Sequence, residues 1–349
     1  MTGRRLAAAL LASIAFTYTP QNRRPTKQRT APPPTTGTDR VVAIGDVHGD
    51  LEALRSCLRL SGLVDREDAW VAAPGATLVS CGDVLDRGDG DWDCLTYLAD
   101  LKTRAADAGG DVHLVLGNHE VLNVLGDVRF ASRGALVRCA CETDPGRSPG
   151  SRDDEWLVAA RKRAFAPGSG EGAKLLAALC GDAPVARVCG DTLFCHGGLH
   201  VVALTVGAAA RRKARGGDAP GPGAGSRALL DALNGDAARW LGGAGRLPPA
   251  LSPSPSSPVW SRSYSHPAGA EPSPRQCGDA RSALDALGCA RMVVGHTPQL
   301  NQGINACCDD SVFRIDTGLS AYYGGPKEVL ELRPGKRPAV LRSAPRGFL

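Results

Sequence analysis

The sequence predicts an α/β fold, and three observations support this class. Short apolar or β-rich runs recur along the chain, glycine-containing loops follow them, and helical patterns come next, as far as residue 125. With 349 residues and 43% hydrophobic content, the chain is long enough to bury a substantial core. We therefore expect the reactive groups at the carboxyl ends of the strands.

The apolar spacing places the expected elements in order. Asp50 is the expected N-cap of a helix that carries Leu51, Leu54 and Leu58 on its apolar face. Further helices are expected over 91–106, 156–165, 173–179, 227–240 and 280–287. Strands are expected over 41–44, 77–81, 112–116, 185–196, 292–294, 312–315, 328–332 and 339–342. We interpret 39–349 as one domain with insertions near 127–183 and 207–258, the second of which ends in a Ser-Pro linker over 252–258.

Five motifs place Asp, His or Asn beside glycine directly after an apolar or β-rich run. They are Gly45-Asp46-Val47-His48-Gly49-Asp50, Gly82-Asp83-Val84-Leu85-Asp86-Arg87-Gly88, Gly117-Asn118-His119-Glu120, Cys195-His196-Gly197-Gly198 and Gly295-His296-Thr297. Each one alone also has a structural explanation, such as an N-cap at Asp83 or a turn at Asn118. The occurrence of all five together favours a shared chemical site.

The residue types in these motifs suit the hydrolysis of a phosphate ester. That reaction needs a nucleophile at neutral pH and compensation for charge on the phosphoryl oxygens. Two divalent metals about 3.5–4 Å apart supply both, because they acidify a bridging water and clamp the oxygens of an in-line displacement. Imidazole, carboxylate and carbonyl oxygen are suitable ligands, and one carboxylate must be shared. We assign Asp46 and His48 to one metal, Asp83 to the bridge, and Asn118, His196 and His296 to the other.

The remaining polar residues of these motifs suggest roles toward the substrate. His119 is left over beside Asn118, so its imidazole can protonate the leaving oxygen while Asp86 orients its other nitrogen. Arg87 follows Asp86 and offers a planar fork for phosphate oxygens. The motifs thus supply a general acid and a phosphate ligand beside the expected metals.

These motifs resemble those of the phosphoprotein phosphatase (PPP) superfamily of calcineurin-like metallophosphoesterases, over roughly residues 39 to 341. The chain is most similar to the Shewanella-like protein phosphatases, through Val84-Leu85, Val259-Trp260-Ser261-Arg262-Ser263-Tyr264 and the segment 316–325, Asp-Thr-Gly-Leu-Ser-Ala-Tyr-Tyr-Gly-Gly. The resemblance implies two mixed β-sheets in a sandwich flanked by helices, with the two metals at one rim. It implies the same ligands, and Arg262 as a second phosphate-binding arginine. The Ser-Ala-Pro-Asn-Tyr element of the eukaryotic Ser/Thr branch is absent from the sequence.

The sequence therefore predicts a metal-dependent phosphomonoester hydrolase, most simply a protein phosphatase. An alternative is a hydrolase of nucleotides, dinucleoside polyphosphates or other small phosphoesters, because no residue in the insertions identifies the substrate. A second alternative is a non-catalytic scaffold that binds phosphorylated partners. Nitrogen and oxygen ligands suit Mn, Fe or Zn, and we expect Mn. The sequence leaves the oligomeric state open.

Several other polar residues have structural interpretations. Asp316 is expected to cap a turn with Thr317 and Gly318, and His113 is expected in the core. We interpret His200 as a residue at the surface or just behind the ligands. Tyr322 and Tyr323 are interpreted as packing residues. Twelve cysteines is a high number for a reducing compartment, and candidates for regulatory disulfides lie near Cys139, Cys141, Cys277 and Cys307.

The first 38 residues have the composition of a targeting leader. They hold six basic and no acidic residues, so the remainder of the chain, whose total charge is +5, carries only −1. This distribution argues against nucleic-acid binding. An apolar run from Leu6 to Phe16 is too short to span a bilayer, and 17–38 is basic and rich in Thr and Pro. We expect a bipartite plastid leader, with a secretory signal or a mitochondrial presequence as alternatives, and a mature chain without a membrane span.

Overall fold

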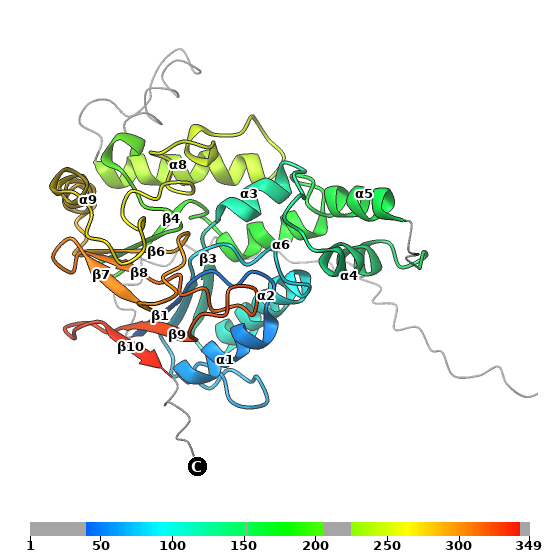
Figure 1. Ribbon diagram of the computed structural model, residues 1–349, viewed down its shortest axis with the longest axis horizontal. Coiled ribbons are helices and arrows are strands. Elements are labelled where there is room, and N and C mark those ends of the chain that lie inside the picture. The colour runs from blue at the N-terminus through cyan, green and yellow to red at the C-terminus, as the bar shows by residue number, and fades with distance from the viewer. Residues whose placement is uncertain (1–39, 149, 151–152, 205–224, 343–349) are drawn as a thin grey trace, which may run out of the picture. The chain divides into compact units, whose positions relative to one another are not determined.

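The computed structural model describes residues 40–148, 150, 153–204 and 225–342, which form two β-sheets with helices around them (Figure 1). The leader expected in 1–38 and part of the second expected insertion lie outside the described residues. The first sheet has the order β10-β9-β1-β2-β3, with β1 Arg40–Ile44, β2 Ala76–Ser80, β3 Asp111–Leu114, β9 Glu328–Leu332 and β10 Ala339–Arg342. The second has the order β4-β5-β6-β8-β7, with β4 Ala186–Cys189, β5 Thr192–Cys195, β6 Arg291–Val294, β7 Asn305–Cys307 and β8 Val312–Arg314.

Both sheets are mixed, as the resemblance implied. Strands β1, β2 and β3 run parallel, whereas β9 pairs antiparallel with both of its neighbours, β1 and β10. In the second sheet β5, β6 and β8 run parallel, and β4 and β7 pair antiparallel at the edges. The parallel strands in each sheet bring their carboxyl ends to one edge, so the motif loops that follow them meet there.

The alternation of side chains along β1 explains why the two sheets stack. Val41 and Ala43 point into a cluster that includes Phe194 and Val293 of the second sheet. Val42 and Ile44 belong to the cluster formed with the helices on the outer face. Both faces of β1 are buried from Val41 onward, which fits the uninterrupted apolar run over 41–44.

Helices cover the outer faces of this sandwich (Figure 1). Their bounds are α1 Leu51–Ser61, α2 Asp91–Asp107, α3 Asn118–Val124, α4 Arg133–Thr143, α5 Asp154–Ala164, α6 Glu171–Cys180, α8 Ser226–Leu241 and α9 Pro274–Leu287, with a 3₁₀ turn over Pro249–Leu251. The predicted cap of α1 is confirmed, since Asp50 Oδ1 accepts a hydrogen bond from the Ala53 backbone N–H at 2.8 Å.

Some expectations were wrong. The segment 252–258 is not a free linker, because Ser257 Oγ donates to the Ala250 carbonyl at 2.7 Å and the Gly197 N–H donates to Pro258 O at 2.6 Å. His113, expected in the core, is only half-buried on edge strand β3, with Nε2 3.1 Å from Asp111 Oδ2. Helix α4 and strand β7 were not predicted, because neither has a clear apolar period.

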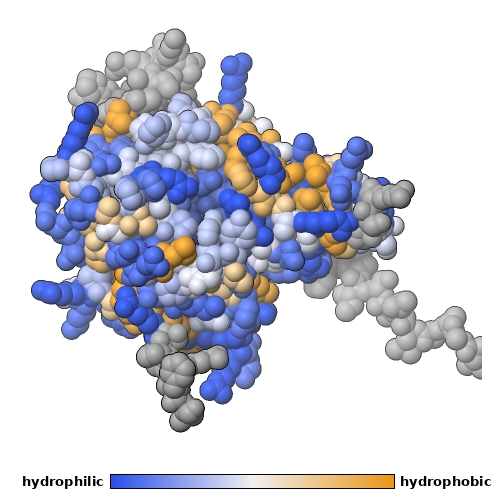
Figure 2. Space-filling model, in the orientation of Figure 1, coloured by the Kyte–Doolittle hydropathy of each residue, from blue (hydrophilic) through white to orange (hydrophobic). Residues whose placement is uncertain are grey.

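The viewed face of the molecule is mainly hydrophilic, with the most continuous hydrophobic area over α3 and the neighbouring end of α5 (Figure 2). Within the described ranges, no helix has both the length and the apolar character that a bilayer span requires.

Candidate metal centre and phosphate site

The loops after five strands bring the predicted site residues to one edge of the sandwich. The buried members from these loops are Asp46, His48, Asp83, Asp86, Asn118, His119, His196 and His296. Two groups of potential metal ligands form there. Their ligand atoms lie within 4.8 Å of one another, and the groups are His48, Asp83 and His119, and Asp83, His196 and His296. Asp83 is common to both groups, which is the position expected of a bridging carboxylate.

The first set of contacts surrounds His196. Its Nδ1 lies 2.7 Å from the Cys81 carbonyl and donates to it, so Nε2 carries the lone pair of the neutral imidazole. That Nε2 lies 3.3 Å from Asp83 Oδ2, 3.1 Å from Asn118 Oδ1 and 3.0 Å from His296 Nδ1. Ligands at about 2.0–2.1 Å from a tetrahedral metal lie roughly 3.3 Å from each other. The spacing of these four groups therefore fits a shared divalent cation.

The second set of contacts lies on the other side of Asp83. His48 Nδ1 donates to the Leu85 carbonyl at 3.1 Å, and its Nε2 lies 3.8 Å from Asp83 Oδ2. Asp46 accepts the His296 backbone N–H with both carboxylate oxygens, each at 3.2 Å. The pKa of Asp46 is raised first by burial, then by the charge of Asp316, and then by that of the neighbouring Asp83. His48 and Asp83 thus lie close enough to share a second cation, and Asp46 lies beside Asp83.

The protonation of the site also suits cations. Burial lowers the pKa of His48 to about 4, and burial with the neighbouring His196 and Arg262 lowers the pKa of His296 well below its usual range. Both imidazoles are therefore neutral at pH 7 and can act as ligands. Burial and neighbouring carboxylates raise the pKa of Asp46, because three acidic groups share a region with little solvent. Cations at this position would remove that repulsion.

The backbone around these residues is unusual. Positive φ angles occur at five non-glycine residues of the motifs: His48 (47°), Asp83 (52°), Asp86 (69°), Arg87 (71°) and His296 (70°). Such conformations persist where surrounding contacts enforce them, and they concentrate at functional sites. Gly117 must lack a side chain, because a Cβ there would overlap the Asp83 carboxylate.

Buried Glu120 supplies part of this enforcement. Its carboxylate accepts from the backbone N–H groups of Asp83 and Val84, each at 2.8 Å, and of Leu85 at 3.1 Å. It also accepts from the Gly117 N–H at 2.8 Å. One side chain thus fixes the loop that carries the shared ligand. The sequence analysis quoted Glu120 within its motif and gave it no role.

His119 and Asp86 form the expected pair. His119 Nδ1 lies 2.6 Å from Asp86 Oδ2, and its Nε2 lies 3.9 Å from Asp83 Oδ2, facing the candidate metals. Burial lowers the pKa of His119, but the charges of Asp83 and Asp86 outweigh burial and raise it overall. Asn123 Nδ2 donates to Asp86 Oδ1 at 2.9 Å, so both carboxylate oxygens are engaged. The Asp86 contact and the charge of Asp83 thus favour the protonated form of His119 beside the shared ligand.

Helix α5, in the expected insertion, reaches this pair through Arg161. Arg161 is fully buried, and its Nη1 and Nη2 donate to the Asp91 carboxylate at 3.0 and 2.6 Å. Its Nε donates to Asn123 Oδ1 at 2.8 Å, and Asp91 Oδ2 accepts the Asp86 backbone N–H at 3.1 Å. The insertion therefore supports the residues that orient His119. Sequence reasoning missed Arg161, because an arginine in an amphipathic helix usually faces solvent.

The two predicted phosphate arginines have different surroundings. Arg87 lies between the rings of Phe130 and Tyr322, with its guanidinium carbon 4.6 and 5.3 Å from their centroids. Its buried Nε has no hydrogen-bond partner among the described residues. Arg262 Nη1 donates to the His296 carbonyl at 2.6 Å and to Thr297 Oγ1 at 2.8 Å. Arg262 is thereby attached directly to the backbone of a candidate ligand.

Two further features extend the predicted site. The turn cap predicted for Asp316 is confirmed, since Oδ1 accepts from the Gly318 N–H at 2.9 Å. Asp316 is also buried beside Asp46, and burial raises its pKa to about 6. Tyr323 lies with its ring 5.5 Å from that of His48, and Tyr322 is 57% exposed beside Arg87. Both tyrosines border the site, whereas their place beside Gly-Gly in the sequence had favoured core or rim packing over a position at the mouth of the site.

Neutral imidazoles on both sides of one buried carboxylate, at the edge of a β-sandwich, form a donor set that suits a two-metal phosphoesterase. A family model of calcineurin-like phosphoesterases matches residues 39–300. The chain therefore belongs to the calcineurin-like phosphoesterase family.

Individual relatives show which group within this family the chain resembles. Shewanella-like protein phosphatase 2 of Arabidopsis thaliana is 32% identical over 88% of this chain and 78% of its own length. Shewanella-like protein phosphatase 1 of Plasmodium berghei is 26% identical over 82% of this chain and 69% of its own. The crystal structure of a mutant cold-active protein tyrosine phosphatase is similar in fold, with a TM-score of 0.62 and 21% identity, over 88% of this chain and 81% of that one. The resemblance to the Shewanella-like group is thus confirmed.

Proposed function

We propose that this chain is a metal-dependent phosphomonoester hydrolase that acts on phosphorylated protein. The observation that carries the proposal is the arrangement around Asp83. Ligand nitrogens lie on both sides of its carboxylate, and the His119–Asp86 pair lies directly beside it. A non-catalytic phosphate binder has no need for a buried imidazole paired with a carboxylate at this position.

Six side chains would hold the metals. One metal would be bound by Asp46 and His48, the other by Asn118, His196 and His296, and Asp83 would be shared. Two bound divalent metals supply charge to the phosphoryl oxygens and lower the pKa of water between them. We propose Mn as the native metal, with Fe and Zn as the competing possibilities for this nitrogen and oxygen donor set.

The other residues act on the substrate. Arg87 and Arg262 would bind the phosphoryl oxygens, since each presents guanidinium nitrogens beyond those already bonded. His119 would donate its Nε2 proton to the leaving oxygen, while Asp86 keeps the imidazole oriented through Nδ1. Asp86 also stabilises the protonated imidazole before transfer.

Two observations support a protein as the substrate. The relatives that are 32% and 26% identical carry the name protein phosphatase. In addition, the exposed ring of Tyr322 beside Arg87 gives an apolar surface next to the phosphate position, where a residue side chain or peptide can rest.

The test is a turnover panel. Metal-stripped protein is reloaded with Mn²⁺ and assayed on phosphotyrosine, phosphoserine and phosphothreonine peptides and on dinucleoside polyphosphates. We expect turnover of at least one phosphopeptide at a kcat/KM well above that of any dinucleotide. A preference for the dinucleotides would reject the protein substrate, and no turnover of any ester by the Mn²⁺-loaded chain would reject the hydrolase.

A further inference from the structure

A network of hydrogen bonds lies behind Arg262 and involves His200, which belongs to none of the five motifs. His200 Nδ1 lies 2.6 Å from Asp279 Oδ2, and its Nε2 lies 2.8 Å from Ser261 Oγ. Tyr264 donates through its hydroxyl to the same Asp279 oxygen at 2.8 Å, and its ring stacks on His200 with centroids 5.0 Å apart. Ser261 immediately precedes Arg262 in the sequence.

The order Ser261, His200, Asp279 is that of a nucleophilic triad, but the burial of the serine excludes this role. Ser261 has 0% of its surface exposed, and its Oγ also accepts from the Ser263 N–H at 3.2 Å. A nucleophilic hydroxyl must be reachable by substrate. With Asp279 as acceptor, His200 donates from Nδ1 and accepts the Ser261 hydroxyl at Nε2, so the network joins three segments of the chain.

The close approach of two of these segments depends on the glycines after His196. The backbone of Gly198 has a φ of 119°, and a Cβ there would lie 2.5 Å from the Tyr264 ring. At Gly197 a Cβ would lie 2.6 Å from the Ser261 carbonyl. The loop that carries the candidate ligand His196 thus packs tightly against the segment that carries Arg262.

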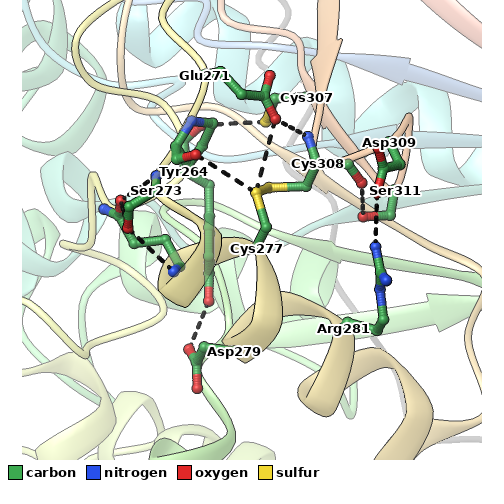
Figure 3. Close-up of a disulfide and its surroundings, with 12 residues drawn as sticks. Tyr264, Glu271, Ser273, Cys277, Asp279, Arg281, Cys307, Cys308, Asp309 and Ser311 are labelled. Atoms are coloured by element: carbon green, nitrogen blue, oxygen red, sulfur yellow. Dashed lines mark hydrogen bonds and ion pairs between the residues drawn. A yellow bond between two sulfur atoms is a disulfide. The ribbon is translucent and has the colours of Figure 1, made fainter.

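Helix α9 provides the third segment and is itself fixed. Asp279 lies on α9. Two residues before it, Cys277 forms a disulfide with Cys308, in the turn between β7 and β8 (Figure 3). Glu271 accepts the Cys308 N–H at 2.6 Å, and Gln276 Nε2 donates to the Ser263 carbonyl at 2.8 Å. Asp279 is therefore a fixed acceptor, and His200 and Tyr264 are held against it.

We propose that His200 is a positioning residue for Arg262. Through Ser261 and Asp279 it fixes the segment that bears this arginine to the loop that bears His196, and it thereby sets the affinity for the phosphoryl group. The proposal rests on the proposed phosphate-binding role of Arg262. Because a shift of about 1 Å in a positioning group can cost on the order of 10²-fold in rate, a loosened Arg262 should bind phosphate measurably more weakly.

A double-mutant cycle tests this role. The inhibition constant of inorganic phosphate and the kcat/KM for p-nitrophenyl phosphate are measured on the Mn²⁺-loaded full chain, for the native protein, His200→Ala, Arg262→Ala and the double variant. We expect Arg262→Ala to weaken phosphate binding about 10-fold or more, because it removes a charge-assisted hydrogen bond to the phosphoryl group. His200→Ala should weaken it several-fold, and the double variant should be no weaker than Arg262→Ala.

The outcomes distinguish a failure of the proposed role of His200 from a failure of the proposed phosphate-binding role of Arg262. If the effects of His200→Ala and Arg262→Ala multiply, His200 acts independently and the inference fails while the phosphate role of Arg262 stands. If Arg262→Ala leaves phosphate affinity unchanged, the proposed role of Arg262 fails and the inference fails with it.

Matched variants guard against a general loss of structure. Tyr264→Phe keeps the ring and removes only the hydroxyl that bonds Asp279, and it should weaken phosphate binding in the same coupled way if His200→Ala does not fold. His113→Ala removes a histidine that also pairs with an aspartate, on β3 far from Arg262 along the chain. We expect it to leave the phosphate constant unchanged. A phosphate effect in His113→Ala equal to that in His200→Ala would show that the readout reports only stability and would overturn the inference.

Discussion

The pair of His119 and Asp86 makes a prediction that depends on the leaving group and on pH. Replacing His119 by Ala removes the proton that the account delivers to the leaving oxygen. Esters with poor leaving groups, such as phosphoserine peptides, should then lose about 10²–10⁴-fold in rate, the usual contribution of general acid catalysis. Aryl phosphates with good leaving groups need no such proton and should lose far less.

The direction of the pH effect follows from the contact at Asp86. The 2.6 Å contact between His119 Nδ1 and Asp86 Oδ2 favours the protonated imidazole, because the carboxylate carries the opposite charge. The pKa of His119 is raised overall, so the acid form persists to higher pH than in a free histidine, and activity is lost as pH rises through it. Asp86→Asn removes this carboxylate charge and should shift the basic limb to lower pH.

The assay compares kcat/KM for a phosphoserine peptide and for p-nitrophenyl phosphate across a pH series, in the native chain, His119→Ala and Asp86→Asn. Metal content is measured on the same samples, so that loss of a ligand is not mistaken for loss of an acid. An equal loss on both substrates, or a basic limb that does not move in Asp86→Asn, would refute the reasoning.

Three further predictions concern stability and the leader. Cys277→Ser opens a 31-residue loop, so it should lower the free energy of unfolding by about 3–4 kcal/mol in oxidising buffer, and a native chain equally stable in reducing buffer would count against this. Arg161→Met leaves the buried Asp91 unpaired and should cost about 3–5 kcal/mol in chemical denaturation, whereas adding Asp91→Leu should recover much of that loss. We propose that residues 1–38 direct the chain to a plastid. A chain that starts at Asp39 should retain full turnover, and a reporter fused to the leader should be imported, whereas a cytosolic or secreted reporter would reject this.

Short-range sequence patterns were sufficient to predict the site residues that directly follow strands. Asp46, Asp83 and His196 each follow an apolar run and lie beside glycine, and the fold places all three at one edge. The prediction of two mixed sheets came from the family resemblance, because the alternation of apolar and polar residues cannot assign strands to sheets. Gly117 shows why such motifs are readable in sequence, since a side chain there would collide with Asp83.

Residues that act across long stretches of sequence could not be predicted. Arg161 bonds Asp91 from 70 positions away, and nothing near it marks it as buried. Asp316 was correctly predicted as a turn cap, but its place beside Asp46 depends on how β8 packs into the second sheet. The role of His200 could not be predicted either, because its partners Ser261 and Asp279 lie 61 and 79 positions further along the sequence.

The most direct test of the central claim is a metal titration of the full-length chain. Metal-stripped protein is titrated with Mn²⁺ while bound metal and turnover of p-nitrophenyl phosphate are measured on the same samples, in parallel with Asp83→Asn. The account predicts that turnover reaches its plateau at two ions per chain, and that Asp83→Asn lowers metal content and turnover together. Full turnover with one ion per chain, or an Asp83→Asn variant that keeps both ions and its activity, would contradict it.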